Sequence, residues 1–270
     1  MKKSTITFWG VRGSLASAGL KTAKYGGNTP CVEISYGKTV IICDAGTGIR
    51  PLGRAMIKSS RGRKIGATIL LSHLHLDHVI GLPFFEPLYK KANRFTIINP
   101  KRSAAKLKSD LKKLFGPPYF PVSISDVAPA LKFGEFKGPV KTGEITIESF
   151  KCNHPDDSYA FKFLTPGKKT VVYVCDNEPS ESQDAFIRFM RGADVLIHDA
   201  QYTPAQYKDK TGWGHSPYTY ALNLAAKAGV KKLVLFHYDP AATDRDLDRI
   251  SKKIRKSGVL LSREGMRLTV

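Results

Sequence analysis

Short apolar runs alternate with longer amphipathic segments along the chain, and the two patterns predict different elements. The apolar runs are bounded by glycine, proline or polar residues, which is typical of buried strands. The amphipathic segments repeat apolar residues at three- and four-residue spacing, which predicts helices with one buried face. We expect strands at residues 4–9, 31–35, 39–43, 67–71, 95–98, 145–150, 158–164, 170–175, 194–197 and 233–236. We expect helices near residues 49–60, 103–115, 181–190, 217–228 and 243–256.

Turn residues between these elements indicate how they connect. The run Tyr36-Gly37-Lys38 predicts a tight hairpin between two early strands. Two further strands, at 259–261 and 266–269, flank a glycine turn and predict a closing hairpin. Residues 116–143 are rich in proline and glycine, so we expect a surface excursion that can rim a site. Strands that alternate with helices, without a linker or repeat, predict one α/β domain over residues 1–270.

The composition is typical of a globular protein with one sizeable core, because 42% of the 270 residues are hydrophobic. No apolar run of about 18 residues is present, so we expect no membrane-spanning helix. Glycines interrupt the apolar start of the chain, which favours a first strand over a signal peptide. The spacing of Cys31, Cys43, Cys152 and Cys175 favours buried reduced thiols in a cytoplasmic protein over a zinc–thiolate site or a disulfide.

The stretch from Ser72 to His78 concentrates the chemistry of the chain. It contains His73, His75, Asp77 and His78 directly after an apolar strand. Ligand sites of α/β proteins form at the carboxyl ends of such strands. His73 and His75 alternate as in extended chain and point the same way, whereas the next two residues fall where the chain turns into a helix. Because histidine is the commonest metal ligand, the cluster suits two metal ions better than a histidine-rich surface loop.

Three more ligand-type residues stand immediately beyond apolar strands. They are His154, Asp176 and His237. Each alone could be a satisfied buried polar group, but independent structural residues have no reason to share this placement. Strand ends that converge on one rim can supply the ligands of two metal ions.

The remaining candidates are His198, Asp199 and His215. The first two end a strand, and His198 could equally be structural. His215 opens a helix between glycines and serine, where a helix N-terminus can bind phosphate and a histidine can donate a hydrogen bond. Because the ligand positions are already filled, we interpret His198 and His215 as groups that support the ligands or take part in acid–base chemistry, and we favour a functional role for His215. Arg12 and Arg50 adjoin glycine loops and are candidate phosphate contacts, with surface charge as the alternative for each.

The net charge of +20 indicates an anionic partner such as a phosphate ester, a nucleotide or a nucleic acid. Lysines on solvated helix faces are the alternative explanation. The helix near residues 103–115 shows both options, because its leucines predict a buried face and its opposite face is basic. That face consists of Lys101, Arg102, Lys106, Lys108, Lys112 and Lys113. It is either a solvated face or a patch that steers the substrate.

The spacing His73-x-His75-x-Asp77-His78 resembles the HxHxDH motif of the metallo-β-lactamase superfamily, and the other strand-end residues follow in family order. This resemblance implies a four-layer αββα sandwich of two similar halves. It implies that one metal ion is bound by His73, His75 and His154. It implies that the second ion is bound by Asp77, His78 and His237. Asp176 would bridge the two ions, and Asp44 would brace the metal-binding loop.

Within that superfamily the chain resembles the phosphodiesterase branch, which includes ribonuclease Z and cyclic-phosphate phosphodiesterases. His198-Asp199-Ala200-Gln201 stands where ribonuclease Z has His-Glu-Ala-Thr, and Gly214-His215-Ser216 matches the catalytic-histidine element. Asp199 replaces the glutamate, and Gln201 replaces the threonine. The interval between His154 and Asp176 is too short for the tRNA-gripping arm that ribonuclease Z carries there. The resemblance therefore favours a small phosphodiester over tRNA.

We expect a metal-dependent phosphodiesterase that acts on a cyclic nucleotide or another small phosphodiester. Two divalent ions, with zinc favoured over manganese or iron, would activate a water that Asp77 orients. His215 would contact the phosphate or protonate the leaving oxygen, and Asp199 would fix its tautomer. A ribonuclease with the same site and a nucleotide-sensing binding protein are the alternatives. The sequence is compatible with a homodimer.

Overall fold

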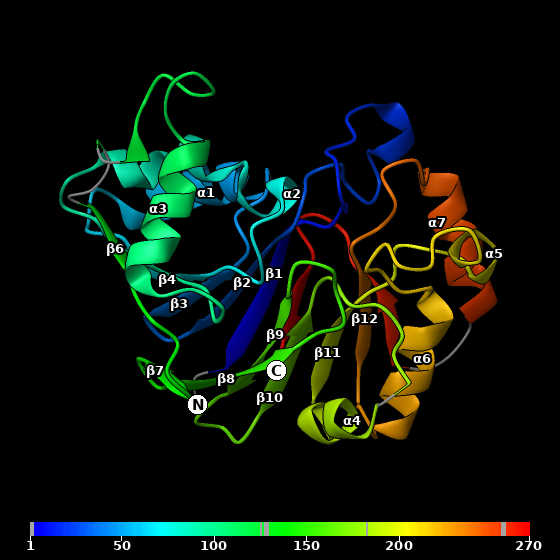
Figure 1. Cartoon of the computed structure of the whole chain (residues 1–270). Helices are drawn as coiled ribbons and strands as arrows, with labels where there is room; N and C mark the ends of the chain where they lie inside the picture. The colour runs from blue at the N-terminus through cyan, green and yellow to red at the C-terminus, as the bar shows by residue number, and fades with distance from the viewer. Residues whose placement is uncertain (1–2, 125, 127–129, 182, 255–257) are drawn as a thin grey trace.

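Two seven-stranded sheets lie face to face, and helices cover the outer face of each sheet (Figure 1). The structure is a computed structural model that describes residues 3–124, 126, 130–181, 183–254 and 258–270. This arrangement is the predicted αββα sandwich. None of the described helices is both long enough and apolar enough to cross a membrane.

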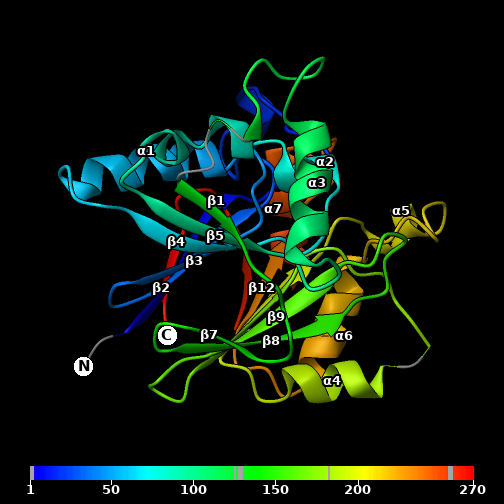
Figure 2. The ribbon, with the colours of Figure 1, turned by 60° about the vertical axis from the view of Figure 1, so that its left-hand side comes forward.

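The first sheet has the strand order β14-β1-β2-β3-β4-β5-β6. Its strands are β1 (Ser4–Gly10), β2 (Cys31–Tyr36), β3 (Thr39–Cys43), β4 (Gly66–Leu70), β5 (Arg94–Ile98), β6 (Leu131–Phe133) and β14 (Arg267–Thr269). The helices in this part of the chain are η1 (Leu20–Thr22), α1 (Ile49–Ser60), α2 (Leu76–Val79), η2 (Leu82–Phe84), η3 (Glu86–Tyr89) and α3 (Ala104–Leu114). Figure 2 shows α1 and α3 on the outer side of this sheet.

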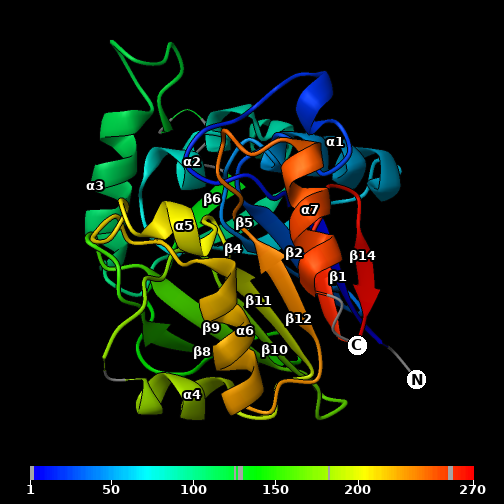
Figure 3. The ribbon, with the colours of Figure 1, turned by 90° about the vertical axis from the view of Figure 1, so that its right-hand side faces the viewer.

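The second sheet has the order β13-β12-β11-β10-β9-β8-β7. Its strands are β7 (Val140–Thr142), β8 (Ile145–Lys151), β9 (Tyr159–Leu164), β10 (Thr170–Val174), β11 (Val195–Asp199), β12 (Leu233–Phe236) and β13 (Val259–Leu261). Its helices are α4 (Asp184–Met190), α5 (Pro204–Tyr207), α6 (Tyr218–Lys227) and α7 (Asp244–Ile254). Figure 3 shows α6 and α7 on its outer side.

The two sheets repeat one pairing pattern. In the first, β1, β2 and β3 pair antiparallel, and β4, β5 and β6 continue in parallel. In the second, β8, β9 and β10 pair antiparallel, and β11, β12 and β13 continue in parallel. The two similar halves implied by the resemblance are therefore visible in the topology.

Side-chain alternation explains why the first sheet needs cover on both faces. Ile41 and Leu70 belong to the core between the sheets, whereas the neighbouring Ile42 and Ile69 belong to the core under α1 and α3. Successive side chains of a strand point to opposite faces, so a continuous apolar run requires two apolar layers. The buried parallel strands β3 and β4 satisfy this requirement, and both end at the edge of the sandwich where the histidine loop lies.

The structure corrects two predictions about connections. Strands β13 and β14 do not form a hairpin, because β13 pairs with β12. Strand β14 pairs with β1 in the other sheet, and Figure 3 shows these two strands side by side. The excursion 116–143 also contains two edge strands, β6 and β7, and its residues 125 and 127–129 lie outside the described residues. Residue 182 of the predicted helix 181–190 and residues 255–256 of the predicted helix 243–256 also lie outside them.

Arg12 is a structural residue, so both predicted roles, phosphate contact and surface charge, are wrong for it. Its side chain is fully buried, and its guanidinium donates to the carbonyls of Gly26 (2.9 Å), Asp239 (3.1 Å) and Ala242 (2.8 Å). Burial lowers the pKa of Arg12 against the opposing effect of nearby acidic groups. The buried cation connects the end of β1 to the segment after β12, whereas Arg50 is exposed on α1.

Replacing the buried arginine should destabilise the protein strongly. Arg12→Met leaves three buried carbonyls without their donor, so we expect the free energy of unfolding to fall by roughly 3 kcal/mol or more. Arg50→Met makes the same substitution at an exposed site and should change the free energy of unfolding by less than about 0.5 kcal/mol. Urea unfolding followed by circular dichroism measures both. Equal effects of the two substitutions would contradict the structural role of Arg12.

Candidate metal centre

The histidine loop combines an extended half with a helical half, as the sequence predicted. After β4 the chain stays extended through His73 to His75, whose φ of −60° and ψ of 151° precede α2. Asp77 and His78 then lie within α2. His73 and His78 are fully buried, whereas His75 is exposed at the mouth of the site. The change from strand to helix turns all four side chains toward one point.

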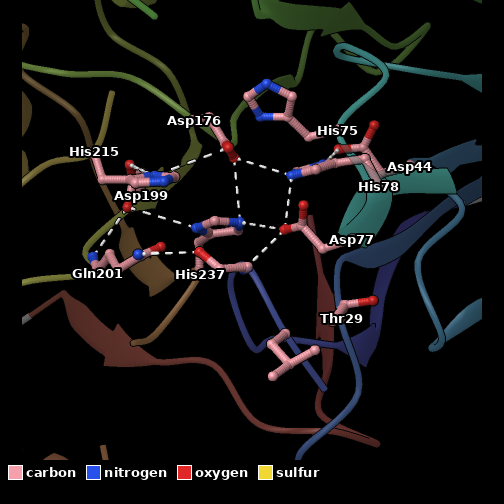
Figure 4. A network of polar contacts seen from close by, with 12 residues as sticks. Thr29, Asp44, His75, Asp77, His78, Asp176, Asp199, Gln201, His215 and His237 are labelled. Carbon is pink, nitrogen blue, oxygen red and sulfur yellow. Dashed lines mark hydrogen bonds and ion pairs between the residues drawn. The ribbon is translucent and has the colours of Figure 1, made fainter. Parts of the chain in front are cut away.

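Asp176, at the end of β10, is the centre of the site (Figure 4). Its Oδ1 lies 3.2 Å from Nε2 of His237 and 3.3 Å from Nε2 of His78. Its Oδ2 lies 3.4 Å from Nε2 of His73 and 3.9 Å from Nε2 of His154. One carboxylate therefore faces histidines from both halves of the sandwich.

The predicted ligands gather in two groups that share this carboxylate. The first group contains His73, His75, His154 and Asp176, whose ligand atoms all lie within 4.8 Å of one another. The second contains His78, Asp176, His237 and Cys175 at the same spacing. Oδ2 of Asp77 adjoins the second group, at 3.1 Å from Nε2 of His78 and 3.3 Å from Nε2 of His237.

Cys175 is the member that sequence reasoning missed. It had the appearance of an inert buried thiol, and only its position directly before Asp176 could have singled it out. Burial and the Asp176 carboxylate raise the pKa of its thiol well above the usual range, against the opposing effect of His78. In the metal-free protein Cys175 is therefore a thiol, and the histidine nitrogens and carboxylates are the better ligands.

The donor set fits divalent metal ions. Among the described residues, the buried atoms of the site without a hydrogen-bond partner include Nε2 of His73, Nε2 of His78 and Oδ1 of Asp176. Unpaired polar atoms are costly in a protein interior. A cation can satisfy converging imidazole nitrogens and carboxylate oxygens of which several have no hydrogen-bond partner.

The ionisation of the site also suits metal binding. Burial and the neighbouring His78 lower the pKa of His73 well below its usual value, so its imidazole is neutral. Burial alone would raise the pKa of Asp77 and Asp176, but the surrounding histidines lower both. The same carboxylates overcome burial and raise the pKa of His78, which therefore holds a proton in the metal-free protein. Metal binding at His78 would release that proton.

Hydrogen bonds behind the ligands fix their orientation. Asp44 accepts from the backbone N–H of Ser72 (2.7 Å) and from the hydroxyls of Ser72 (3.0 Å) and Tyr173 (2.8 Å). Nδ1 of His78 lies 3.0 Å from the same carboxylate, so Nε2 faces Asp176. Nδ1 of His154 likewise faces the carbonyl of Gly214 at 3.0 Å. Such contacts set which imidazole nitrogen is free to bind a metal.

A glycine is required at position 214. Its φ of +87° suits glycine, and a Cβ there would lie 2.1 Å from Nδ1 of His154. The backbone N–H groups of Gly212 and Gly214 donate to the buried carboxylate of Glu178, at 2.6 Å and 2.9 Å. Glu178 thus fixes the turn that orients His154, a role that its isolated position in the sequence did not suggest.

Asp199 and His215 form the predicted pair beside the metal ligands (Figure 4). Nδ1 of His215 lies 3.2 Å from Oδ2 of Asp199 and 3.9 Å from Oδ2 of Asp176. Asp199 also accepts from the backbone N–H groups of Gln201 (2.9 Å) and Ser216 (3.1 Å). Burial opposes protonation of His215, but the two carboxylates raise its pKa to about 9. The pair is thus a rigid, carboxylate-backed imidazole.

His198 lies outside this cluster because it alternates with Asp199 along β11. Its Nδ1 faces the carbonyl of Asp199 at 2.7 Å, and its ring packs near Phe186 and Tyr220. Of the two interpretations that the sequence left open for His198, the structure supports the structural one.

Comparison with known proteins places this geometry in a family. The pattern of the beta-lactamase superfamily domain matches residues 39–238, which include every residue of both ligand groups. The chain belongs to the beta-lactamase superfamily. Its sequence is similar to ribonuclease Z of Metallosphaera sedula, with 24% identity over 253 residues that cover 80% of this chain and 84% of that protein.

Solved structures share the fold. The metallo-beta-lactamase fold protein YhfI of Bacillus subtilis superposes with a TM-score of 0.76 and 22% identity over 99% of this chain and 100% of YhfI. A diphosphatase of the PhnP family superposes with a TM-score of 0.71 and 18% identity over 98% of this chain and 97% of that one. The chain therefore shares the fold of these proteins, and its described residues include a candidate site for divalent metal ions.

A matched pair of substitutions tests the metal centre. Asparagine keeps a donor near the Nδ1 position of histidine and removes Nε2. His154→Asn should therefore weaken zinc binding at least about tenfold, because it deletes a ligand atom. His198→Asn should retain the wild-type zinc content, because its Nε2 lies outside both groups. Metal analysis after equilibrium dialysis against zinc measures both, and an unchanged zinc content in His154→Asn would refute the assignment.

Proposed function

We propose that the chain is a metal-dependent phosphodiesterase that hydrolyses a cyclic nucleotide or another small phosphodiester. The observation that carries this proposal is the Asp199–His215 pair, held 3.9 Å from the shared carboxylate of the metal centre. Phosphodiester hydrolysis needs a proton donor for the leaving oxygen beside an activated water, and the pair stands where such a donor is required. The relatives named ribonuclease Z support a phosphodiester as the bond that is cleaved.

The ligand groups suit two divalent ions, for which zinc is the first choice and manganese or iron are alternatives. Such ions supply an acidic water and positive charge for the phosphate oxygens. In the proposed set, the first site consists of His73, His75 and His154. The second consists of Asp77, His78 and His237, and Asp176 is shared.

Two side chains direct the chemistry in this proposal. Asp77 accepts a hydrogen bond from the backbone N–H of Ser14 at 2.8 Å, which fixes the carboxylate that would orient the attacking water. His215 presents Nδ1 to Asp199, so its Nε2 is free to hydrogen-bond the phosphate or protonate the leaving oxygen. The backbone donors to Asp199 prevent it from turning away, so the imidazole keeps one orientation.

The structure of the interval between His154 and Asp176 supports a small substrate. Strands β9 and β10 and the turn between them occupy most of it, and they pair with each other within the second sheet. Every residue of this interval is described by the structure, and none of its segments extends from the sheet to grip a folded RNA. A ligand of this site would therefore be held mainly by the groups around the metal centre.

A substrate panel tests the proposal. The zinc- or manganese-loaded protein should hydrolyse bis-p-nitrophenyl phosphate and at least one 2′,3′- or 3′,5′-cyclic nucleotide. His215→Ala should lower kcat by roughly 10²–10⁴-fold with unchanged metal content, because only the proton donor is lost. Asp199→Asn should add little to that loss in the double variant, since the two residues act as one unit. If the metal-loaded wild type hydrolysed none of these diesters, the proposal would be wrong.

Ribonuclease activity is the second candidate, and the charge of the chain favours it. The net charge is +20, and α3 presents Lys108 and Lys112 to solvent. Other basic groups near this face are already paired, because Lys106 contacts Asp110 and Lys101 lies 3.1 Å from Asp157. The basic face is thus partly neutralised, which weakens the grip on RNA without removing it.

Salt dependence separates the two candidates. If α3 contacts about three phosphates, the KM for a structured RNA should rise roughly tenfold or more between 50 and 200 mM salt. The KM for a small diester should change much less. A Lys108→Ala, Lys112→Ala double variant should reduce the salt dependence of the KM for RNA. Lys58→Ala, on the exposed face of α1, should leave that salt dependence unchanged. RNA cleavage that is insensitive to salt would rule out this electrostatic grip.

A further inference from the structure

Exposed apolar side chains gather at one place beside the metal centre. Among the described residues, eight large hydrophobic side chains are exposed, and four of them line a single groove of about 610 Å³. These four are Leu76, Ile80, Phe84 and Tyr119, which are 59%, 44%, 51% and 81% exposed. Contiguous exposed apolar surface usually marks a binding site, and this volume is in the range of small-molecule pockets.

The groove shares a helix with the metal centre. It lies between α2 and the segment that follows α3, in the region where Figure 2 shows these elements together. Leu76, Val79 and Ile80 stand on one face of α2 and line the groove. Asp77 and His78 point from the same helix toward Asp176. Because Leu76 lies between His75 and Asp77 in the chain, the groove begins at the mouth of the site.

The walls of the groove are aromatic, and its rim carries a positive charge. Phe84 and Phe120 contact each other edge to face, with ring centroids 5.5 Å apart. Tyr119 adds a third ring that is mostly in solvent. Lys113 also lines the groove, and no described carboxylate lies within ion-pair distance of it. Aromatic side chains stack on nucleobases, and a lysine at the rim favours a ligand of net negative charge.

We propose that this groove binds the nucleobase of the phosphodiester whose phosphate lies at the metal centre. The inference rests on the proposed function and deepens it, since it makes the substrate a nucleotide rather than any small diester. Continuity with the metal loop through Leu76 and the charge of Lys113 select this occupant. Phe84 and Tyr119 are the residues that confer the preference for a base.

Two chromogenic substrates that share a leaving group test the proposal. Thymidine 5′-(p-nitrophenyl phosphate) carries a base, and methyl p-nitrophenyl phosphate does not. For the metal-loaded wild type, kcat/KM should be at least about tenfold higher for the thymidine ester. Phe84→Ala and Tyr119→Ala should each reduce that ratio several-fold, and both positions are exposed enough for the variants to fold. Leu20→Ala, at a 95% exposed position outside the groove, is the matched control and should leave the ratio unchanged.

The outcomes distinguish this inference from the function on which it rests. Equal kcat/KM values for the two esters, unaffected by Phe84→Ala or Tyr119→Ala, would overturn the base-binding groove and leave the phosphodiesterase intact. Absence of hydrolysis of both esters would overturn the function, and the groove assignment with it. Light scattering provides the third outcome. A dimer that Tyr119→Ala converts to a monomer would assign the groove to a second copy of the chain and overturn the proposal.

Discussion

The buried carboxylate of Asp44 is the constraint on which the site depends. It stands at the end of β3 with a φ of 60°, fully buried, and it binds the histidine loop through Ser72 and the second sheet through Tyr173. A buried charge is tolerable only when its hydrogen bonds are satisfied, so this carboxylate fixes the positions of the groups around it. The histidine loop is therefore anchored to both sheets at once, and the orientation of His78 follows from that anchor.

The repeated topology explains why one carboxylate meets histidines from distant parts of the chain. The parallel strands of each half end at the same edge of the sandwich, and the two edges face each other across the inner core. His73 and His78 come from the first half, and His154 and His237 come from the second. The metal centre forms at the junction between the two halves and needs residues from both. This also explains why the acid–base pair lies beside it, because Asp199 ends β11 and holds His215.

Much of this arrangement could be predicted because it depends on local pattern. Apolar runs identified the strands, and the positions just beyond three of these runs identified His154, Asp176 and His237. Contacts between distant segments have no such signal in the sequence. The carbonyls that bind Arg12 carry no side-chain signal, and the partners of β13 and β14 depend on which sheet edge is open. Tyr173 has the pattern of an ordinary strand residue. The aromatic groove draws on a proline-rich segment, which the pattern predicts as an excursion that can rim a site but not as an aromatic wall.

The placement of β13 and β14 in different sheets has a consequence for how the protein unfolds. The segment between these strands crosses from one sheet to the other, and on the way Glu264 accepts from the backbone N–H of Asn28 while Met266 accepts from Phe8. Neither half can unfold without breaking the hydrogen bonds that this crossing segment makes. The halves repeat each other in shape, yet they are coupled in energy, so thermal or chemical denaturation should proceed as one cooperative transition rather than two.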